Sequence, residues 1–316
     1  DYRVQDDRIR KLYELGKQLN WNVETDIDWN KPRTRLTPEQ RDAIVAFKGY
    51  GPYEALSEEQ KQEFAEHENV WTLSQFLHGE QGALLVASQP TSCAPTLNAK
   101  LYAASQTFDE ARHVEVFNKY LQTKAGYMYP VDPALKSLLD KILTDPRWDL
   151  KFIGMQLIIE GLALSAFTTM KATTPKGELL NDVVELVLRD EARHVTFGIN
   201  YLEEHLKNLS EAEREERARF AYEACVVARM IPKDVFHHWG WNVEEARRIY
   251  LEGEFRQMFR NLMFMRVMPN LRRIGLLTDS VRPLFEQLGM LEYENLKDDG
   301  DIDWAELSRP LFTTAA

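Results

Sequence analysis

The chain has 316 residues, of which 44% are hydrophobic and 11% aromatic, and this composition is ordinary for a globular protein with a large buried core. Its 39 basic and 50 acidic residues give a net charge of −11, which disfavours nucleic acid and anionic membrane surfaces as partners. Only two cysteines occur and no apolar stretch is long enough to predict a membrane span, so we expect a soluble protein of the reducing cytoplasm.

Four long helices are predicted in the middle of the chain. A capping box that begins at Thr37 opens a short helix to about residue 48, and a second one at Ser57 opens a long helix. Apolar residues at three- to four-residue spacing predict two more long helices, and a nearly continuous apolar run predicts a buried one. The four long helices cover about residues 57–88, 96–124, 147–172 and 177–208. Four consecutive long helices favour a bundle.

Further helices are predicted on both sides of this bundle. An amphipathic segment and a Trp-rich connector form a wrapping arm before it, and helices follow it after Ser210, from Asn242 to about Met268, and over 280–288. Because no strand-like alternation of any length appears, the predicted class is all-α. We expect one domain over residues 1–316, with the core bundle at about 57–208 and flanking helices in 1–56 and 209–316.

The pentapeptide Asp-Glu-Ala-Arg-His occurs twice, at residues 109–113 and 190–194. Each copy holds a Glu and a His three residues apart, and on a helix such a pair lies on one face and can bind one metal ion. Charged pentapeptides are common on solvated helices, but two chance copies are expected in only roughly a few chains per million. The sequence therefore predicts two metal-binding helix faces, formed by Glu110 with His113 and by Glu191 with His194.

Each of the other two bundle helices carries one acid in an otherwise apolar stretch. These acids are Glu80 and Glu160, and an acid among apolar residues is costly to bury unless it is paired or bound to a metal. Glu80 precedes Glu110 by 30 residues and Glu160 precedes Glu191 by 31, so the chain is an approximate duplication of one helical hairpin. The predicted ligands are Glu80, Glu110, His113, Glu160, Glu191 and His194.

This ligand set suits a pair of iron ions. Four carboxylates offset the +4 charge of two ferrous ions, and oxygen-rich ligation with two imidazoles fits iron or manganese better than copper. Mn/Fe and Mn/Mn pairs remain open. Beside the ligands, Asp190 is predicted to accept the free N–H of His113, and Asp109 that of His194. Arg112 and Arg193 would neutralise these acids, although plain solvent exposure is an equal alternative for each arginine.

The four-Glu, two-His arrangement is similar to that of ferritin-like di-iron and di-manganese bundles. The sequence resembles the ribonucleotide reductase small-subunit-like branch of that superfamily, and its doubled Asp-Glu-x-Arg-His motif resembles the catalytic subunits of bacterial multicomponent monooxygenases. The resemblance covers about residues 57–208. It implies a ferritin-like four-helix bundle and a non-haem di-iron oxidoreductase of the monooxygenase or oxidase type, which activates O2 at a reduced metal pair.

Three positions depart from particular relatives. Radical-generating reductase subunits usually place a Tyr one turn after the first ligand His, where this chain has Phe117. Ligand-binding oxidases can cross-link a Tyr ahead of the third carboxylate, where this chain has Met155, and arylamine N-oxygenases add a His one turn before the last ligand Glu, where it has Val187. A stored tyrosyl radical and the cross-link are therefore disfavoured, and a third His ligand could come only from elsewhere.

The residues one turn from the ligands are mostly apolar. Core packing explains most of them, and the remainder would line a dry pocket for a small, largely apolar substrate. The candidate pocket residues are Phe76, Leu77, Leu84, Leu157, Ala163, Leu164 and Phe197.

The leading hypothesis is an oxygenase or oxidase that inserts oxygen into a small organic substrate, or desaturates or cleaves it. The sequence has no Gly-rich dinucleotide fingerprint and no Cys cluster, so electrons are expected from a separate reductase or ferredoxin. An N-oxygenase of an amine is the close alternative. A ferroxidase or peroxide-scavenging metal protein and a radical-generating subunit are the others. The sequence names neither the substrate nor the oligomeric state, for which a homodimer is one open form.

Overall fold

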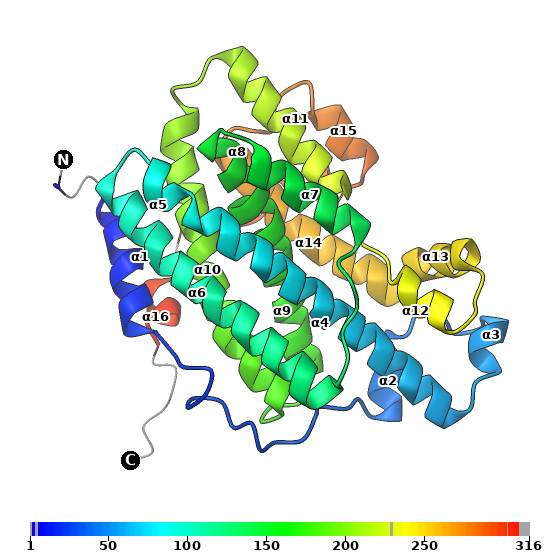
Figure 1. The fold of residues 1–316 in the computed structure, drawn as a ribbon. Coiled ribbons are helices and arrows are strands. Elements are labelled where there is room, and N and C mark those ends of the chain that lie inside the picture. Colours follow the sequence, from blue (N-terminus) through cyan, green and yellow to red (C-terminus); the bar gives the residue numbers. More distant parts are fainter. Residues whose placement is uncertain (1, 4–5, 228–229, 302, 310–316) are drawn as a thin grey trace.

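Four long helical segments lie alongside one another in the middle of the molecule (Figure 1). The computed structural model describes residues 2–3, 6–227, 230–301 and 303–309. The four segments are α4 (Glu58–Ser88), α6 (Leu97–Tyr120), the composite helix Trp148–Thr173 and α10 (Leu179–Leu206). No strand occurs in the described ranges, so the predicted all-α class and the bundle are confirmed.

The helix starts follow the capping signals of the sequence. The Ser57 side chain accepts a hydrogen bond from the Gln60 amide, and the Gln60 side chain accepts one from the Ser57 amide, which closes the box that begins α4. Thr37 and Gln40 open α2 (Pro38–Ile44) in the same way. Helix α2 ends earlier than the predicted residue 48, because the backbone of Val45 is extended.

The third bundle helix is not a continuous α-helix. It consists of α8 (Trp148–Phe152), the π-helical segment η2 (Ile153–Ile159) and α9 (Glu160–Thr173). A π-segment is rare and frequently lies at a functional site, and here it ends directly before Glu160. By length and composition this composite helix could cross a membrane, but 78% of its most apolar window is buried in the protein, as in the core helix of a soluble fold.

A close contact between η2 and α10 depends on Gly198. A Cβ atom at this position would lie 2.5 Å from Cβ of Gln156 in η2, far inside van der Waals contact. The glycine therefore lets η2 approach α10 at the turn that follows His194.

We expect Gly198→Ala to push η2 away from α10, to destabilise the protein by about 1–3 kcal/mol, and to lower its iron content, because η2 positions Glu160. Chemical denaturation and metal analysis measure the two effects. Gly79→Ala is the control, since a Cβ at Gly79 in α4 meets nothing within 4 Å and alanine favours a helix by about 1 kcal/mol. Equal stability and equal iron content of the two variants would contradict the role of Gly198.

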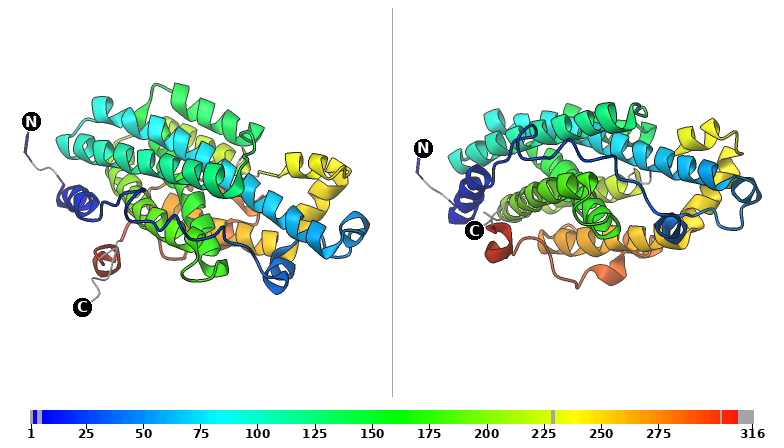
Figure 2. Two further views of the ribbon diagram at one scale, coloured as in Figure 1. Left: turned by 60° about the horizontal axis from the view of Figure 1, so that its bottom comes forward. Right: turned by 90° about the horizontal axis from the view of Figure 1, so that it is seen from below.

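The flanking elements cover the bundle on several sides. Figure 2 shows α14 (Glu254–Arg273) on the face of α9 and α10 that is turned away from α4 and α6, so the molecule has three helical layers. Helix α1 (Asp7–Gln18) packs on α6 and α10. The arm that follows α1 buries Trp21, Val23 and Ile27 against the bundle. The other elements are α3 (Gly51–Glu54), α5 (Pro90–Cys93), η1 (Leu121–Ala125), α7 (Pro133–Thr144), α11 (Glu211–Val227), α12 (Lys233–His238), α13 (Val243–Glu252), α15 (Arg282–Gln287), η3 (Leu291–Tyr293) and α16 (Trp304–Leu307).

One predicted helix is divided in two. The sequence predicts a single helix from Asn242 to about Met268, but the structure ends α13 at Glu252 and begins α14 at Glu254. Gly253 between them is extended, and a Cβ there would lie 2.7 Å from Cβ of Ala46. The contact with Ala46 therefore leaves no room for a side chain at the point where the two helices meet.

Candidate metal centre

Six buried acids and histidines from the four bundle helices meet in the middle of the molecule. Helix α4 supplies Glu80 and α9 supplies Glu160 as its first residue, while α6 and α10 each supply one Glu-x-x-His pair. None of the six is more than 5% exposed. The structure brings together all six side chains that the sequence predicts as ligands, Glu80, Glu110, His113, Glu160, Glu191 and His194.

Two of the glutamates lie between the histidines. Glu110 places Oε2 3.3 Å from Nδ1 of His113 and Oε1 3.1 Å from Nδ1 of His194. Glu191 places Oε1 3.0 Å from Nδ1 of His113 and Oε2 3.7 Å from Nδ1 of His194. Each carboxylate therefore turns one oxygen toward each histidine and would help to hold a metal ion beside them.

The remaining two glutamates lie at opposite ends of the cluster. Glu80 Oε2 is 3.3 Å from Nδ1 of His113, and Glu160 groups with Glu110 and His194. The possible ligand atoms form two sets that share Glu110, and within each set they lie within 4.8 Å of one another. The cluster thus offers two adjacent metal positions, one for each histidine.

The atoms that face these positions lack protein partners. Buried side-chain atoms without a hydrogen bond include Oε2 of Glu110, Oε2 of Glu160, both carboxylate oxygens of Glu191 and Nδ1 of His194. A buried polar atom without a partner costs free energy, and a cation would satisfy these oxygens and this nitrogen together. Four carboxylates and two imidazoles also have the charge and donor chemistry that two iron ions require. The residues present therefore fit an iron pair.

Protons take the place of metal charge in the metal-free protein. Burial, followed by the charge of Glu191, raises the pKa of Glu80 to about 8, and burial with Glu110 raises the pKa of Glu160. Burial opposes a charge on His113, but the carboxylates of Asp190 and of the glutamates that face the ring outweigh it and raise the His113 pKa. The pKa of His194 is raised in the same way, mainly by Glu110.

Because iron binds carboxylates and neutral imidazoles, these protons must leave when the metal enters. We expect anaerobic Fe(II) binding to be at least about tenfold tighter at pH 8 than at pH 6, since each proton released strengthens binding by up to about tenfold per pH unit. Competition with a calibrated chelator measures the affinity, and a pH indicator measures the released protons. An affinity that does not change between pH 6 and pH 8 would contradict the assignment of these groups as ligands.

An aspartate holds the far nitrogen of each histidine. Nε2 of His113 lies 3.2 Å from Oδ2 of Asp190, and Nε2 of His194 lies 3.2 Å from Oδ2 of Asp109. These are the two pairings that the sequence predicts. An aspartate that accepts the Nε2 proton fixes the tautomer and leaves Nδ1 for the metal.

Two buried arginines neutralise these aspartates. Arg193 donates to Asp190 at 2.5 Å and to Asp109 at 3.1 Å, and Arg112 donates to Asp109 and, at 3.2 Å, to Asp190. Arg112 is 4% exposed and Arg193 is 0% exposed, so the alternative that they are solvent-exposed is wrong. Burial opposes the ionised form of Asp190, but Arg193 and His113 outweigh it and hold the Asp190 pKa far below its usual range.

The sequence reasoning missed two residues that touch the site. Gln106 donates to Oε1 of Glu110 at 3.1 Å and to Oε1 of Glu160 at 2.9 Å. Its position four residues before Glu110 puts it on the ligand face of the helix, so helical spacing could have identified it. Trp21 of the arm donates its indole N–H to Asp190 at 2.8 Å and stacks on His113 with ring centroids 6.3 Å apart. No local pattern connects Trp21 with a residue 169 positions away.

Apolar side chains occupy the three positions that depart from particular relatives. Phe117 is fully buried and packs against Phe76 and Phe167, while Met155 in η2 and Val187 in α10 are buried as well. All seven histidines of the chain are described, and only His113 and His194 belong to the two ligand sets of this centre. No third histidine therefore reaches it in this conformation.

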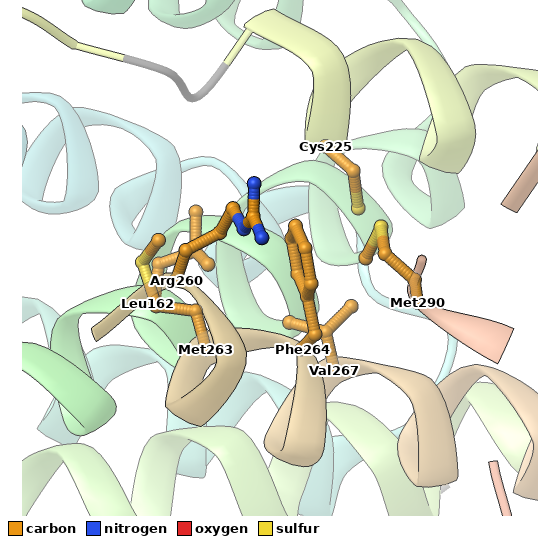
Figure 3. Close-up of a pocket in the computed structure, with 7 residues that line it drawn as sticks. All are labelled: Leu162, Cys225, Arg260, Met263, Phe264, Val267 and Met290. Carbon is orange, nitrogen blue, oxygen red and sulfur yellow. The ribbon is translucent and has the colours of Figure 1, made fainter. Parts of the chain in front are cut away.

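Six of the seven candidate pocket residues are packed in or against the core, and Leu84 is half-buried outside these clusters. Leu157, Leu164 and Phe197 belong to one hydrophobic cluster, Leu77 to a second one, and Phe76 and Ala163 pack against that second cluster. A nearby cavity has a volume of about 20 Å³, enough for one water molecule (Figure 3). None of the predicted pocket residues lines it. Its lining residues are Leu162, Cys225, Arg260, Met263, Phe264, Val267 and Met290.

This cavity lies outside the metal centre. Leu162 follows Glu160 by two residues and therefore faces the opposite side of α9. A substrate pocket formed by the seven apolar residues stays a prediction, and its opening would require these packed side chains to move.

Comparisons with known proteins agree with this geometry. The profile of the family described as P-aminobenzoate N-oxygenase AurF matches residues 3–275. No protein in the curated set matches the sequence. Among solved structures, a mutant R2-like ligand-binding oxidase with an anaerobically reconstituted Mn/Fe cofactor has a TM-score of 0.54 at 20% identity and covers 87% of this chain and 94% of its own. An R2-like ligand-binding oxidase with an aerobically reconstituted metal cofactor after photoconversion has a TM-score of 0.51 at 18% identity, with coverage of 85% and 93%. At these identities the likeness to the solved structures concerns the fold.

Proposed function

The chain belongs to the AurF family of di-iron N-oxygenases, and from this membership we propose that it oxygenates a small organic substrate at an iron pair held by the six clustered ligands. It is a di-iron oxidoreductase that uses O2 as co-substrate. The observation that supports the ligand assignment best is the set of buried glutamate oxygens without hydrogen-bond partners, which face the two histidines. When bound, the iron pair supplies the electrons that reduce O2.

The protein residues have separable tasks in this proposal. Glu110, which belongs to both ligand sets, would help to hold both metals. Glu80 and Glu191 would hold the metal beside His113, and Glu160 the metal beside His194. Asp109 and Asp190 would orient the histidines, while Gln106 would steady Glu110 and Glu160 through its amide. The apolar side chains around the centre would keep water from the reacting atoms.

We propose that the substrate is small and largely apolar, and that an aromatic amine is the second, narrower candidate. The family profile matches most of the chain, including both Glu-x-x-His helices, and its description names an N-oxygenase of p-aminobenzoate. Val187 shows that a third histidine one turn before Glu191 is absent from this chain. If the chain oxygenates an amine, it does so with the two histidines that the centre contains.

The wider context of the enzyme is also part of the proposal. The sequence contains no binding motif for a redox cofactor beyond the metal ligands, which supports electron delivery by a separate reductase or ferredoxin. The hydrophobic clusters run from the arm through the bundle to α14, which supports one domain over residues 1–316. A cytoplasmic location fits two free cysteines, and a homodimer is compatible with the fold.

The experiment is an anaerobic loading with two Fe(II) per chain, followed by O2 and a chemical reductant in the presence of p-aminobenzoate or benzoate. N-oxygenation would place one oxygen atom of O2 on the amine nitrogen and release the other as water, with two electrons and two protons consumed. A product from p-aminobenzoate alone supports the amine, and a ring-oxygenated product from both compounds supports a general oxygenase. Oxidation of many iron ions per chain without an organic product would favour a ferroxidase and contradict the proposal.

A further inference from the structure

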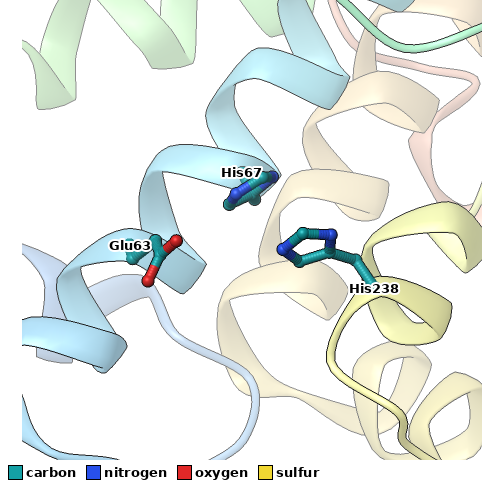
Figure 4. A group of neighbouring side chains, drawn as sticks. All are labelled: Glu63, His67 and His238. Atoms are coloured by element: carbon teal, nitrogen blue, oxygen red, sulfur yellow. The ribbon is translucent and has the colours of Figure 1, made fainter.

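A second group of metal-binding side chains lies outside the bundle centre. Glu63 and His67 lie four residues apart on one face of α4, and His238 is the last residue of α12. Each offers one ligand atom, and these atoms lie within 4.8 Å of one another. Figure 4 shows Glu63 and His238 on either side of the His67 ring.

The two histidines already lie in close contact. Their ring centroids are 4.4 Å apart with an angle of 29° between the planes. Two imidazole nitrogens and one carboxylate oxygen are a common ligand set for a divalent transition metal.

His67 is oriented by a neighbouring tyrosine. The Tyr129 hydroxyl lies 2.6 Å from Nδ1 of His67. Among the described residues, no side chain forms a hydrogen bond with Nε2 of His67. Metal-bound histidines usually hold their second nitrogen in such a contact, which fixes the tautomer and the ring. When the Tyr129 oxygen accepts a hydrogen bond from Nδ1–H, Nε2 of His67 is the nitrogen left to bind a metal.

We propose that Glu63, His67 and His238 form a mononuclear site for a divalent transition-metal ion such as Zn²⁺, separate from the iron pair. Glu63 and His238 are exposed and His67 is half-buried, so water can complete the coordination shell. No residue is shared with the bundle centre, because His67 lies 13 residues before Glu80 and is about 20 Å from it along α4.

The site would fasten α12 to the bundle. Helix α12 packs on α4 through an aromatic cluster that includes Phe64, Phe236 and Trp241. A metal bound by His238 and by two residues of α4 would add a coordinate link across this contact. Metal binding would then stabilise the native protein without taking part in the oxygen chemistry.

The test uses protein that already carries two iron ions per chain. Zn²⁺ is titrated by calorimetry, and zinc and iron are counted after desalting. The expected result is one zinc per chain with the iron content unchanged, and a rise in Tm of roughly 5 °C at a hundredfold excess of free zinc over Kd. Zinc gained only as iron is lost, or no zinc bound, would overturn the proposal.

Matched variants distinguish this site from other surface histidines. His238→Ala should weaken zinc binding by more than about a hundredfold, because even the loss of an orienting partner costs about 10- to 100-fold. His237→Ala removes the adjacent exposed histidine and should bind zinc as the parent does. Tyr129→Phe should keep one zinc per chain and weaken its binding by about tenfold. Equal zinc affinity of the His238 and His237 variants would refute the site while leaving the iron chemistry untouched.

Discussion

Glu110→Gln is expected to reduce the iron content from two ions per chain to less than one and to lower the rate of O2-dependent turnover by more than about a hundredfold. Glu110 belongs to both ligand sets and turns one oxygen toward each histidine. A glutamine keeps the shape of the side chain but removes the negative charge and leaves one weak donor oxygen. The loss of an orienting contact alone costs about 10- to 100-fold in metal affinity or activity, and loss of a shared ligand costs more.

The measurement is anaerobic Fe(II) binding, followed by O2 uptake with substrate and reductant. Glu115→Gln is the matched control, because Glu115 lies on the same helix and is exposed. The control should bind two iron ions and turn over at the parent rate. If the Glu110 variant also retains two tightly bound iron ions, Glu110 is not a shared ligand and the two-metal geometry is wrong.

The doubled motif made the ligand residues predictable because metal binding by a helix imposes a fixed spacing. A Glu and a His can serve one ion only at positions three or four apart, and that constraint is visible in the sequence. Glu80 and Glu160 were visible for another reason, since an acid in an apolar helix needs a partner. The starts of α2 and α4 followed from capping side chains, which act within one turn.

The features that escaped prediction depend on contacts between distant segments. Trp21 reaches Asp190 only because the arm folds across the bundle, and the close approach of Ala46 to Gly253 joins residues more than 200 positions apart. The π-segment before Glu160 carries an ordinary apolar sequence, so periodicity could not distinguish it from an α-helix. The shape of the substrate pocket could not be predicted for the same reason, since it depends on how apolar side chains from several helices pack.

Arg193→Met is expected to destabilise the metal-free protein by about 3–5 kcal/mol at pH 7 and to lower its Tm by roughly 5–10 °C. Methionine keeps much of the volume, but it leaves Asp190 and Asp109 with Arg112 as their only remaining arginine. Arg193 is fully buried, so no water can replace its guanidinium. We expect the free energy of unfolding to fall because two buried carboxylates would then share one guanidinium.

The pH dependence separates this cause from loss of packing. Arg193 is the largest of the interactions that lower the pKa of Asp190, and a carboxylate with a depressed pKa stabilises the fold at pH values above its unfolded-state pKa. The deficit of the variant should therefore be complete at pH 7 and should shrink as the pH falls below about 4, where the aspartates of the unfolded chain are protonated. A deficit in stability caused by lost packing would not change with pH.

Arg248→Met is the control, because Arg248 is 62% exposed and pairs with Glu252 on the surface, so its loss should cost less than about 1 kcal/mol. Equal stability of the two variants at pH 7 would mean that Arg112 alone neutralises both aspartates.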